Sequence, residues 1–264
     1  MAIEQVEQIV CETGNEQDLS YFKFHRMRFF RMAKSITAIC TPGQVVLDIG
    51  SHYLHSSLIL TFLGYKVHSM DVSEFWNIGF VKDRAEKYNL IPVVENNLET
   101  LESCQTKSDV YDLILFTEIL EHITFNPINF WKNIYRILKN KGLIYITTPN
   151  SLTIFNISRT LLHLILLKGV GQDIDSIFRN VTYGHHWKEY SSSEIRKYFK
   201  KMNDGFTVTI RKYAYKQFPI QNLKDRLRKI FLDLGNLIPY FRGEIEAVIE
   251  VDKSKKWLIE SPEY

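Results

Sequence analysis

The feature that most constrains the fold is a regular alternation of short apolar strands and amphipathic helices between residues 45 and 147. The apolar run of each predicted strand is nearly continuous, which is typical of parallel strands that are covered on both faces. The predicted strands of this stretch are residues 45–49, 66–70, 91–94, 111–116 and 142–147. The helices between them are predicted at residues 55–63, 75–88, 118–122 and 127–140. This order predicts a doubly wound α/β sheet with a ligand crevice at the carboxyl ends of its strands.

After residue 150 the alternation stops, and the pattern predicts an insertion followed by the end of the sheet. Residues 151–190 combine an apolar helix with a polar loop. Ser191 and Glu194 have the spacing of a capping box, which predicts a helix over residues 191–202. The last predicted elements are two strands and a basic helix between them, at residues 206–215, 243–251 and 221–235. With the five strands before residue 150, these two bring the number of predicted strands to seven.

Helix signals are strongest at residues 127–140, where Asn126 is a predicted N-cap, Pro127 lies in the first turn and Gly142 follows the end. They are weakest at the N-terminus. Residues 1–20 show little periodicity and are expected to be frayed, whereas 21–40 is expected to be helical, with its apolar face on the core and its charges in solvent.

Composition and charge exclude several classes of protein. Apolar residues make up 45% of the chain and aromatic residues 13%, which is enough for a folded core. The net charge of +3 does not require a nucleic acid or an anionic membrane as partner. The three cysteines lack CxxC spacing, so they suit a reducing compartment and predict neither disulfides nor a zinc site. No signal peptide is visible, and the apolar run at residues 152–169 is too short to span a bilayer, so a cytoplasmic protein is expected.

Two strand ends carry residues that suit a nucleotide-like ligand. Asp48 and Gly50 end the first predicted strand, and the turn after them exposes backbone N–H groups at the start of a helix. Asp71 ends the second strand, 21 residues past Gly50, where a carboxylate can accept hydrogen bonds from both ribose hydroxyls. On these residues alone, NAD and S-adenosylmethionine fit equally well.

Three further segments resolve that choice: YDLILFTEILEHI, NIYRILKNKGLIYITTPN and the two-strand ending after residue 205. Together they resemble the class I S-adenosylmethionine-dependent methyltransferases, and the resemblance implies a Rossmann-like, seven-stranded, mostly parallel sheet whose last strand is antiparallel. More narrowly, they resemble the branch with ubiquinone-biosynthesis O-methyltransferases and sugar and natural-product methyltransferases. The resemblance covers about residues 42–252 and includes the strand-four signature, here Glu118, Glu121 and His122.

The resemblance implies S-adenosylmethionine as cofactor and S-adenosylhomocysteine as product. It assigns the methionine end to the loop at 48–52, the ribose to Asp71, and the adenine to Asn97 and Leu98. The cofactor-binding residues that it implies are Asp48, Gly50, Ser51, His52, Asp71, Val72, Asn97, Leu98, Thr117 and Glu118.

The strand-one loop departs from the family pattern, since His52 and Leu54 occupy positions where glycine is usual. Glycine permits positive φ and a close backbone approach, and Leu tolerates neither well. The expectation is a turn without positive φ at Leu54, with His52 beside the methionine moiety. Two alternatives remain: a non-catalytic scaffold that has lost the cofactor, or a nucleotide-dependent oxidoreductase. The absence of GxGxxG counts against the oxidoreductase.

A histidine near the acceptor is the expected general base for an O-methylation. His186 matches the family's His-x-x-x-(Tyr/Trp)-(Ser/Thr) register, with His185 as the adjacent candidate, and His122 is expected to be structural. No histidine or acid pair has metal-ligand spacing, so no metal is predicted. An aromatic-rich cap favours a small-molecule, sugar or lipid-linked glycan acceptor; its residues are Phe155, Phe178, Tyr183 and Trp187.

The expected organisation follows from the resemblance. It comprises a helical lid (1–40), the cofactor-binding core (41–150), a cap that borders the acceptor (151–190) and the end of the sheet (191–264). Basic and aromatic residues alternate in 21–34, which favours a lid helix over nucleic-acid binding. The basic helix at 223–231 is expected to face solvent, with peripheral membrane contact as the second interpretation.

Overall fold

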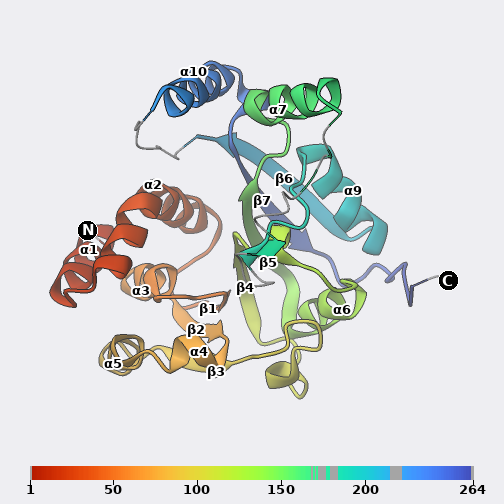
Figure 1. Cartoon of the computed structure of the whole chain (residues 1–264). Coiled ribbons are helices and arrows are strands. Elements are labelled where there is room, and N and C mark those ends of the chain that lie inside the picture. The colour runs from red at the N-terminus through yellow and green to blue at the C-terminus, as the bar shows by residue number, and fades with distance from the viewer. Residues whose placement is uncertain are drawn as a thin grey trace.

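The computed structural model describes residues 2–167, 169, 171, 177–178, 184–214 and 222–262. Its centre is a seven-stranded sheet in the order β3-β2-β1-β4-β5-β7-β6 (Figure 1). The strands are β1 (Val45–Ile49), β2 (Lys66–Asp71), β3 (Ile91–Val94), β4 (Tyr111–Thr117), β5 (Leu138–Pro149), β6 (Phe206–Tyr213) and β7 (Glu244–Val251). β1 to β5 pair in parallel, whereas β7 is antiparallel to its neighbours β5 and β6. The predicted sheet is therefore confirmed.

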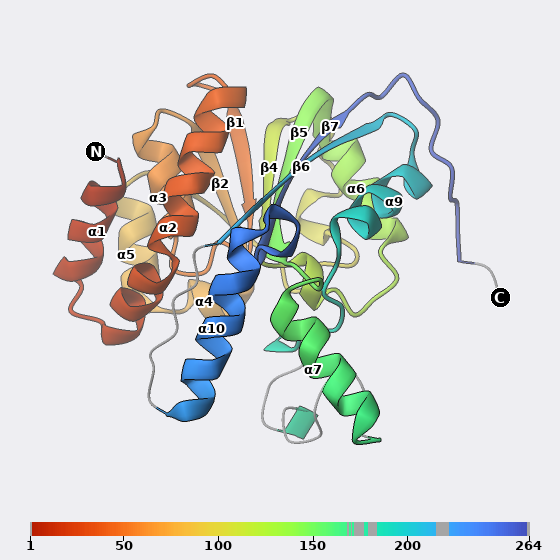
Figure 2. The same cartoon turned by 90° about the horizontal axis from the view of Figure 1, so that it is seen from above.

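Helices cover both faces of this sheet (Figures 1 and 2). One face carries α1 (Ala2–Glu12), α2 (Glu16–Ile39), α3 (His55–Phe62) and α5 (Gly79–Lys87). The other carries α6 (Ile128–Ile137) and α9 (Ser192–Met202). Near the end of β5, α7 (Ile154–Ile165) and α10 (Leu223–Leu237) pack against each other. The short elements are α4 (Ser73–Trp76), η1 (Glu102–Cys104), η2 (Leu120–His122) and η4 (Pro239–Phe241).

The continuous apolar runs of the strands follow from two cores, one on each face. In β4, Leu113 and Leu115 point into the core beneath α2 and α3, whereas Ile114 and Phe116 point into the core beneath α6 and α9. Successive side chains of a strand alternate between faces. The middle of a central parallel strand that is covered on both faces is therefore mostly apolar, whereas Asp112 near the start of β4 forms an ion pair with Lys139.

The N-terminal segment is not frayed, and the prediction for residues 1–20 was wrong. Ile3, Val6 and Val10 are buried and lie on one side of α1, which packs against α2 and α3. Three apolar residues at spacings of three and four form only a short stripe, so the sequence signal is weak. A helix this short depends on tertiary burial rather than on its own propensity.

A buried ion pair connects α2 to the helices α3 and α5. Asp18, fully buried, accepts hydrogen bonds from Arg84 Nη2 (2.7 Å) and His55 Nε2 (2.6 Å). Burial alone would raise the pKa of Asp18, but these two partners hold it below its ordinary value. The contact joins the start of α2, in the predicted lid, to α3 and α5, which lie in the predicted cofactor-binding core.

Several predicted helix bounds were wrong. The segment predicted as one helix at 127–140 ends at Ile137, because Leu138 already pairs with Tyr111 in the sheet. Gly142 consequently lies inside β5. Asn126 accepts a hydrogen bond from the Ile128 N–H, but the N-cap position itself is Pro127.

Two other predicted helices differ in kind. The helix predicted at 75–88 is divided into α4 and α5, and the one at 118–122 is the 3-10 helix η2. The capping box at Ser191 and Glu194 is present. Of the predicted cap residues, Tyr183 lies outside the described residues.

Candidate cofactor and active site

A cavity of about 560 Å³ opens at the carboxyl ends of β1, β2 and β4. This is the edge at which a doubly wound sheet is expected to bind its ligand. The predicted cofactor residues among its lining are Gly50, His52, Asp71, Val72, Leu98, Thr117 and Glu118. Asp48, Ser51 and Asn97 lie outside this lining. The fold therefore brings most of the predicted set to one wall.

The loop after β1 makes a turn that sequence reasoning did not foresee. His52 has φ 49° and Leu54 has φ 66°, so the expectation of a turn without positive φ at Leu54 was wrong. Leu54 is fully buried, and its N–H donates to the Ser51 carbonyl (2.8 Å). A left-handed residue costs about 1–2 kcal/mol, which the burial of a leucine side chain, worth about 1.5–3 kcal/mol, offsets. The loop therefore has positive φ at residues 52 and 54, the conformation that glycines would adopt, although these residues are His and Leu.

Gly50 is the position in this loop that does require glycine. Its φ is 73°, and a Cβ there would collide with the Ile119 side chain. Ile119 itself lines the cavity. A side chain at residue 50 would thus displace part of the cavity wall.

Asp48 supports the loop from beneath. It is fully buried and accepts hydrogen bonds from the hydroxyls of Ser56 (2.5 Å) and Ser57 (2.7 Å) at the start of α3. Burial raises the pKa of Asp48, and the two hydroxyls oppose that shift. Its carboxylate therefore positions the loop and the helix, not a ligand.

Asp71 lies at the end of β2 with its carboxylate on the cavity wall. It accepts hydrogen bonds from the backbone N–H groups of His52 (2.6 Å) and Val72 (2.8 Å). Burial raises the pKa of Asp71 to about 6, although both N–H groups favour the ionised form. The carboxylate is thus oriented by the loop that it faces and is mostly ionised at pH 7.

The residues after β3 that line the cavity are shifted by one or two positions from the predicted Asn97. Leu98 lines the cavity as predicted, but Asn97 is exposed, and Glu95 and Asn96 line the wall in its place. Glu95 is buried and accepts hydrogen bonds from the Asn97 N–H and the Ser103 hydroxyl. The strand end at Val94 was predicted correctly, and because the first residues after a parallel strand face the crevice, Glu95 and Asn96 could have been predicted from it.

His52 is enclosed by aromatic rings from three elements. Its ring lies 4.5 Å from Tyr21, 3.9 Å from Tyr53 and 4.4 Å from Phe75, centroid to centroid. Burial lowers the pKa of His52 to about 3, so the imidazole is neutral at physiological pH. Tyr21 and Phe75 also line the cavity and were not predicted as site residues.

Arg28 of α2 is a second residue that sequence reasoning missed. It was expected to face solvent, yet it is 4% exposed, with Nη2 donating to the Tyr21 hydroxyl (3.2 Å). Its Nη1 lies 3.8 Å from Glu118 Oε1, at the end of β4. Phe24 and Phe30 of the same helix are exposed instead. Because basic and aromatic residues alternate along α2, the sequence pattern did not show which face of the helix is buried.

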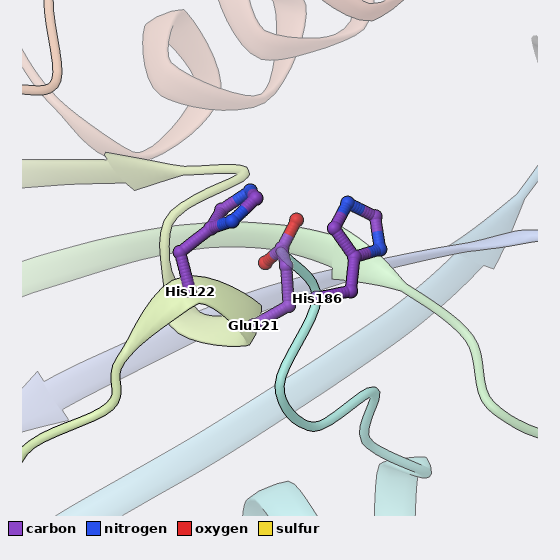
Figure 3. A group of neighbouring side chains, drawn as sticks. All are labelled: Glu121, His122 and His186. Carbon is purple, nitrogen blue, oxygen red and sulfur yellow. The ribbon is translucent and has the colours of Figure 1, made fainter. Parts of the chain in front are cut away.

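The predicted catalytic histidines lie beside the main cavity, not in its lining. His185 is buried, and its carbonyl accepts a hydrogen bond from His122 Nδ1 (2.9 Å). His122, expected to be structural, does line the cavity. Burial and the neighbouring His186 lower the pKa of His122. Spacing along the chain predicted no metal ligands, whereas the fold brings together Glu121, His122 and His186 (Figure 3).

A second cavity of about 240 Å³ lies between α7, α10 and the ends of β5 and β7. His186 and Glu189 line it, together with Phe155 of the predicted cap and Arg228 of α10. His186 thus faces the smaller cavity and His122 the larger one, while their rings lie 4.9 Å apart. The histidine pair lies where the two cavities approach each other.

Among the described residues, no helix is long and apolar enough to cross a membrane. A search of the curated proteins gives no match to this chain.

Solved structures share the fold. A SAM-dependent methyltransferase from Archaeoglobus fulgidus is 17% identical, with a TM-score of 0.56 over 89% of this chain and 100% of its own. The phosphoethanolamine N-methyltransferase 2 of Haemonchus contortus, in complex with S-adenosyl-L-methionine, is 16% identical, with a TM-score of 0.52 over 84% of this chain and 52% of its own. At these identities the likeness establishes the fold alone.

The family profile described as a methyltransferase domain matches residues 24–209, which is more than half of the chain. The match includes β1 to β5 and therefore every strand end that borders the main cavity. The narrower resemblance to ubiquinone-biosynthesis and sugar methyltransferases stays a prediction. The chain belongs to the class I S-adenosylmethionine-dependent methyltransferases, whose cofactor is S-adenosylmethionine.

Proposed function

We propose that this protein transfers the methyl group of S-adenosylmethionine to a hydroxyl of a small-molecule or glycan acceptor, and that its altered loop binds the cofactor. The observation that carries the proposal is the Asp71 carboxylate, which lies on the wall of a 560 Å³ cavity and is oriented by the His52 N–H. A carboxylate in this position accepts hydrogen bonds from ribose hydroxyls. The scaffold alternative predicts a closed loop, and the cavity beside Gly50 and His52 speaks against it.

Each end of the cofactor has a wall of matching chemistry. The apolar side chain of Leu98 and the amide of Asn96 suit the adenine, and Asp71 suits the ribose. The methionine end carries a carboxylate and a sulfonium. The guanidinium of Arg28, which lies behind the cavity wall in contact with Tyr21 and Glu118, adds positive charge near the carboxylate, and the neutral, aromatic surroundings of His52 suit the sulfonium.

The second cavity is the proposed acceptor site. It holds the ring of Phe155, on which a sugar can stack, and the guanidinium of Arg228 lies 5.1 Å from that ring. His186, on the wall of this cavity, lies between the acceptor and the methyl donor. In the reaction, the acceptor oxygen bonds to the methyl carbon, the C–S bond breaks, and the hydroxyl proton leaves with the help of a histidine.

A lipid-linked acceptor and peripheral membrane contact are supported by the surface of α7 and α10. Large apolar side chains on these helices are exposed, and Arg226 of α10 adds positive charge next to them, whereas Lys229 forms an ion pair with Asp233 (2.7 Å). A surface of this composition suits an anionic lipid bilayer. The apolar residues of this surface that are half exposed or more are Leu161, Leu162, Leu164, Ile165, Leu166, Leu167, Leu223, Leu227, Leu234 and Leu237.

Sedimentation with phosphatidylserine vesicles tests the proposed membrane contact. The double variant Leu227→Ser with Leu234→Ser is expected to abolish vesicle binding.

Calorimetric titration with S-adenosylhomocysteine tests the proposed function. The wild type is expected to bind one equivalent. Asp71→Asn should weaken binding by about 10- to 100-fold, the effect of losing hydrogen bonds to a charged group worth about 1.5–3 kcal/mol. Asp83→Asn removes an exposed carboxylate from α5 and serves as the matched control. No binding to the wild type would refute the proposal, and binding of NADH instead would favour an oxidoreductase.

A further inference from the structure

Three side chains with metal-ligand chemistry meet between the two cavities. Glu121 and His122 belong to η2, and His186 belongs to the loop before α9. One ligand atom of each lies within 4.8 Å of those of the other two, and the three side chains point toward a common space (Figure 3). The two imidazole planes are inclined at 84°. His186 lies more than sixty positions after the adjacent Glu121 and His122, so only the fold reveals the group.

Backbone hydrogen bonds fix the two segments to each other. The Trp187 N–H donates to the Glu121 carbonyl (2.8 Å). In return, His122 Nδ1 lies 2.9 Å from the carbonyl oxygen of His185. The residues on either side of His186 are thus both tied to η2, and the group does not depend on a chance approach of two loops.

The tautomers of both histidines follow from their partners. A carbonyl oxygen only accepts, so His122 Nδ1 carries the proton, and in the neutral ring the lone pair is on Nε2. His186 Nδ1 lies 3.2 Å from the carboxylate of Glu189, which imposes the same tautomer. A ring whose Nδ1–H donates to a carbonyl or a carboxylate is the usual state of a histidine that binds a metal through Nε2.

The third side chain is oriented in a comparable way. Glu121 is 1% exposed, and its Oε2 accepts a hydrogen bond from the Thr148 hydroxyl (2.8 Å) at the end of β5. Ligating carboxylates in metal sites are themselves held by such hydrogen bonds. Thr148, His185 and Glu189 thus orient the three side chains by hydrogen bonds, as residues outside the ligand set do in metal centres.

We propose that Glu121, His122 and His186 bind one divalent transition-metal ion, of which Zn²⁺ is the representative, at the junction of the cofactor and acceptor cavities. Two imidazoles and one carboxylate are a known ligand set for catalytic zinc, with a further position for water or substrate. A tetrahedral ion that holds its ligand atoms at about 2.0–2.2 Å places them about 3.3–3.6 Å from one another. The three ligand atoms, which lie within 4.8 Å of one another, must therefore approach by up to about 1.5 Å, and His186, whose side chain is 40% exposed, is the ligand with room to move.

This inference rests on the proposed function and gives the histidine pair a more specific role. The ion binds the acceptor hydroxyl from the acceptor cavity, lowers its pKa and holds it toward the methyl donor. The hydroxyl proton passes to solvent water, and the oxygen forms its bond to the methyl carbon. The C–S bond breaks and its electron pair goes to sulfur, which yields S-adenosylhomocysteine. His186 then acts as a ligand rather than as the base.

Titration with Co²⁺, which replaces Zn²⁺ and absorbs visible light when bound by imidazole, tests the site. Protein freed of metal with a chelator is expected to bind one Co²⁺ per chain. His186→Ala and Glu121→Gln should each weaken binding at least about tenfold, and Glu189→Ala by about 10- to 100-fold. His163→Ala, on α7 and outside the group, is the matched control and should bind Co²⁺ like the wild type.

Two results would overturn the inference: a wild type without stoichiometric Co²⁺ binding, or variants that all bind Co²⁺ as the wild type does. His186→Ala keeps the test valid if Glu121→Gln fails to fold, since His186 is largely at the surface. The same preparations are titrated with S-adenosylhomocysteine. If this ligand binds and Co²⁺ does not, the proposed function stands and the metal site is refuted. If Co²⁺ binds and this ligand does not, the proposed function fails.

Discussion

Lowering the pH should weaken cofactor binding in a range where an ordinary aspartate would have no effect. Asp71 has a pKa of about 6, because burial disfavours its charge and the carboxylates of Asp48 and Glu74 lie nearby. Ribose hydroxyls donate to the ionised carboxylate, so binding favours loss of the Asp71 proton. The affinity is therefore full above pH 6 and is lost as the pH falls through 6.

The magnitude follows from the fraction of ionised Asp71. With a pKa of about 6, roughly one carboxyl in ten is ionised at pH 5. The apparent dissociation constant rises by the inverse of that fraction, about tenfold relative to pH 7.5, or about 1.4 kcal/mol. An aspartate at its ordinary pKa of about 3.9 would still be mostly ionised at pH 5 and would lose almost nothing.

Calorimetric titration of S-adenosylhomocysteine at pH 5, 6 and 7.5 measures this effect. Buffers of different ionisation enthalpy report the proton that binding releases near pH 6. Asp71→Asn binds weakly, and its affinity should not vary over this range. His52 has a pKa of about 3 and stays neutral throughout, so it adds no slope. An affinity of the wild type that is constant from pH 5 to 7.5, or an equal slope in Asp71→Asn, would refute the reasoning.

Substitutions at three positions test the packing beneath the site by urea unfolding. Asp18→Asn leaves Arg84 buried without its carboxylate and should lower the free energy of unfolding by about 3–5 kcal/mol; a loss below about 1 kcal/mol would contradict this. Gly50→Ala should cost at least about 1 kcal/mol and impair S-adenosylhomocysteine binding, because its Cβ meets Ile119. Leu54→Ala should cost about 2–5 kcal/mol, and Leu54→Gly about 1 kcal/mol less, because glycine tolerates φ 66°. An equal loss in both Leu54 variants would show that the loop is unstrained.

The succession of strands along the chain and the main ligand edge could be predicted from the sequence, whereas the order of the strands within the sheet was not predicted. Strands covered on both faces leave continuous apolar runs, as in β4, and the polar residue at the end of such a strand faces the crevice. Asp71 was predicted on that basis and lies on the cavity wall. The end of β3 at Val94 was predicted correctly, but Asn97 was predicted from a family register rather than from that strand end, and the wall includes Glu95 and Asn96 instead.

Backbone conformation and burial of charge depended on contacts between distant residues. Leu54 adopts positive φ because its side chain is buried beneath α2, and no local preference of leucine predicts this. Arg28 and Asp18 are charged residues in a helix of mixed pattern, and only their partners in other elements make their burial possible.

The sequence by itself determined the doubly wound sheet and the place of Asp71 at a strand end, since both follow from local periodicity and from the residue that ends a strand, whereas the antiparallel last strand was implied by the family resemblance. Only the tertiary structure decided that His122, not His185 or His186, lines the main cavity, and that Glu121, His122 and His186 share one space. The physical reason is that a hydrogen bond such as that from Trp187 to Glu121 joins segments more than sixty residues apart, and no spacing along the chain records it.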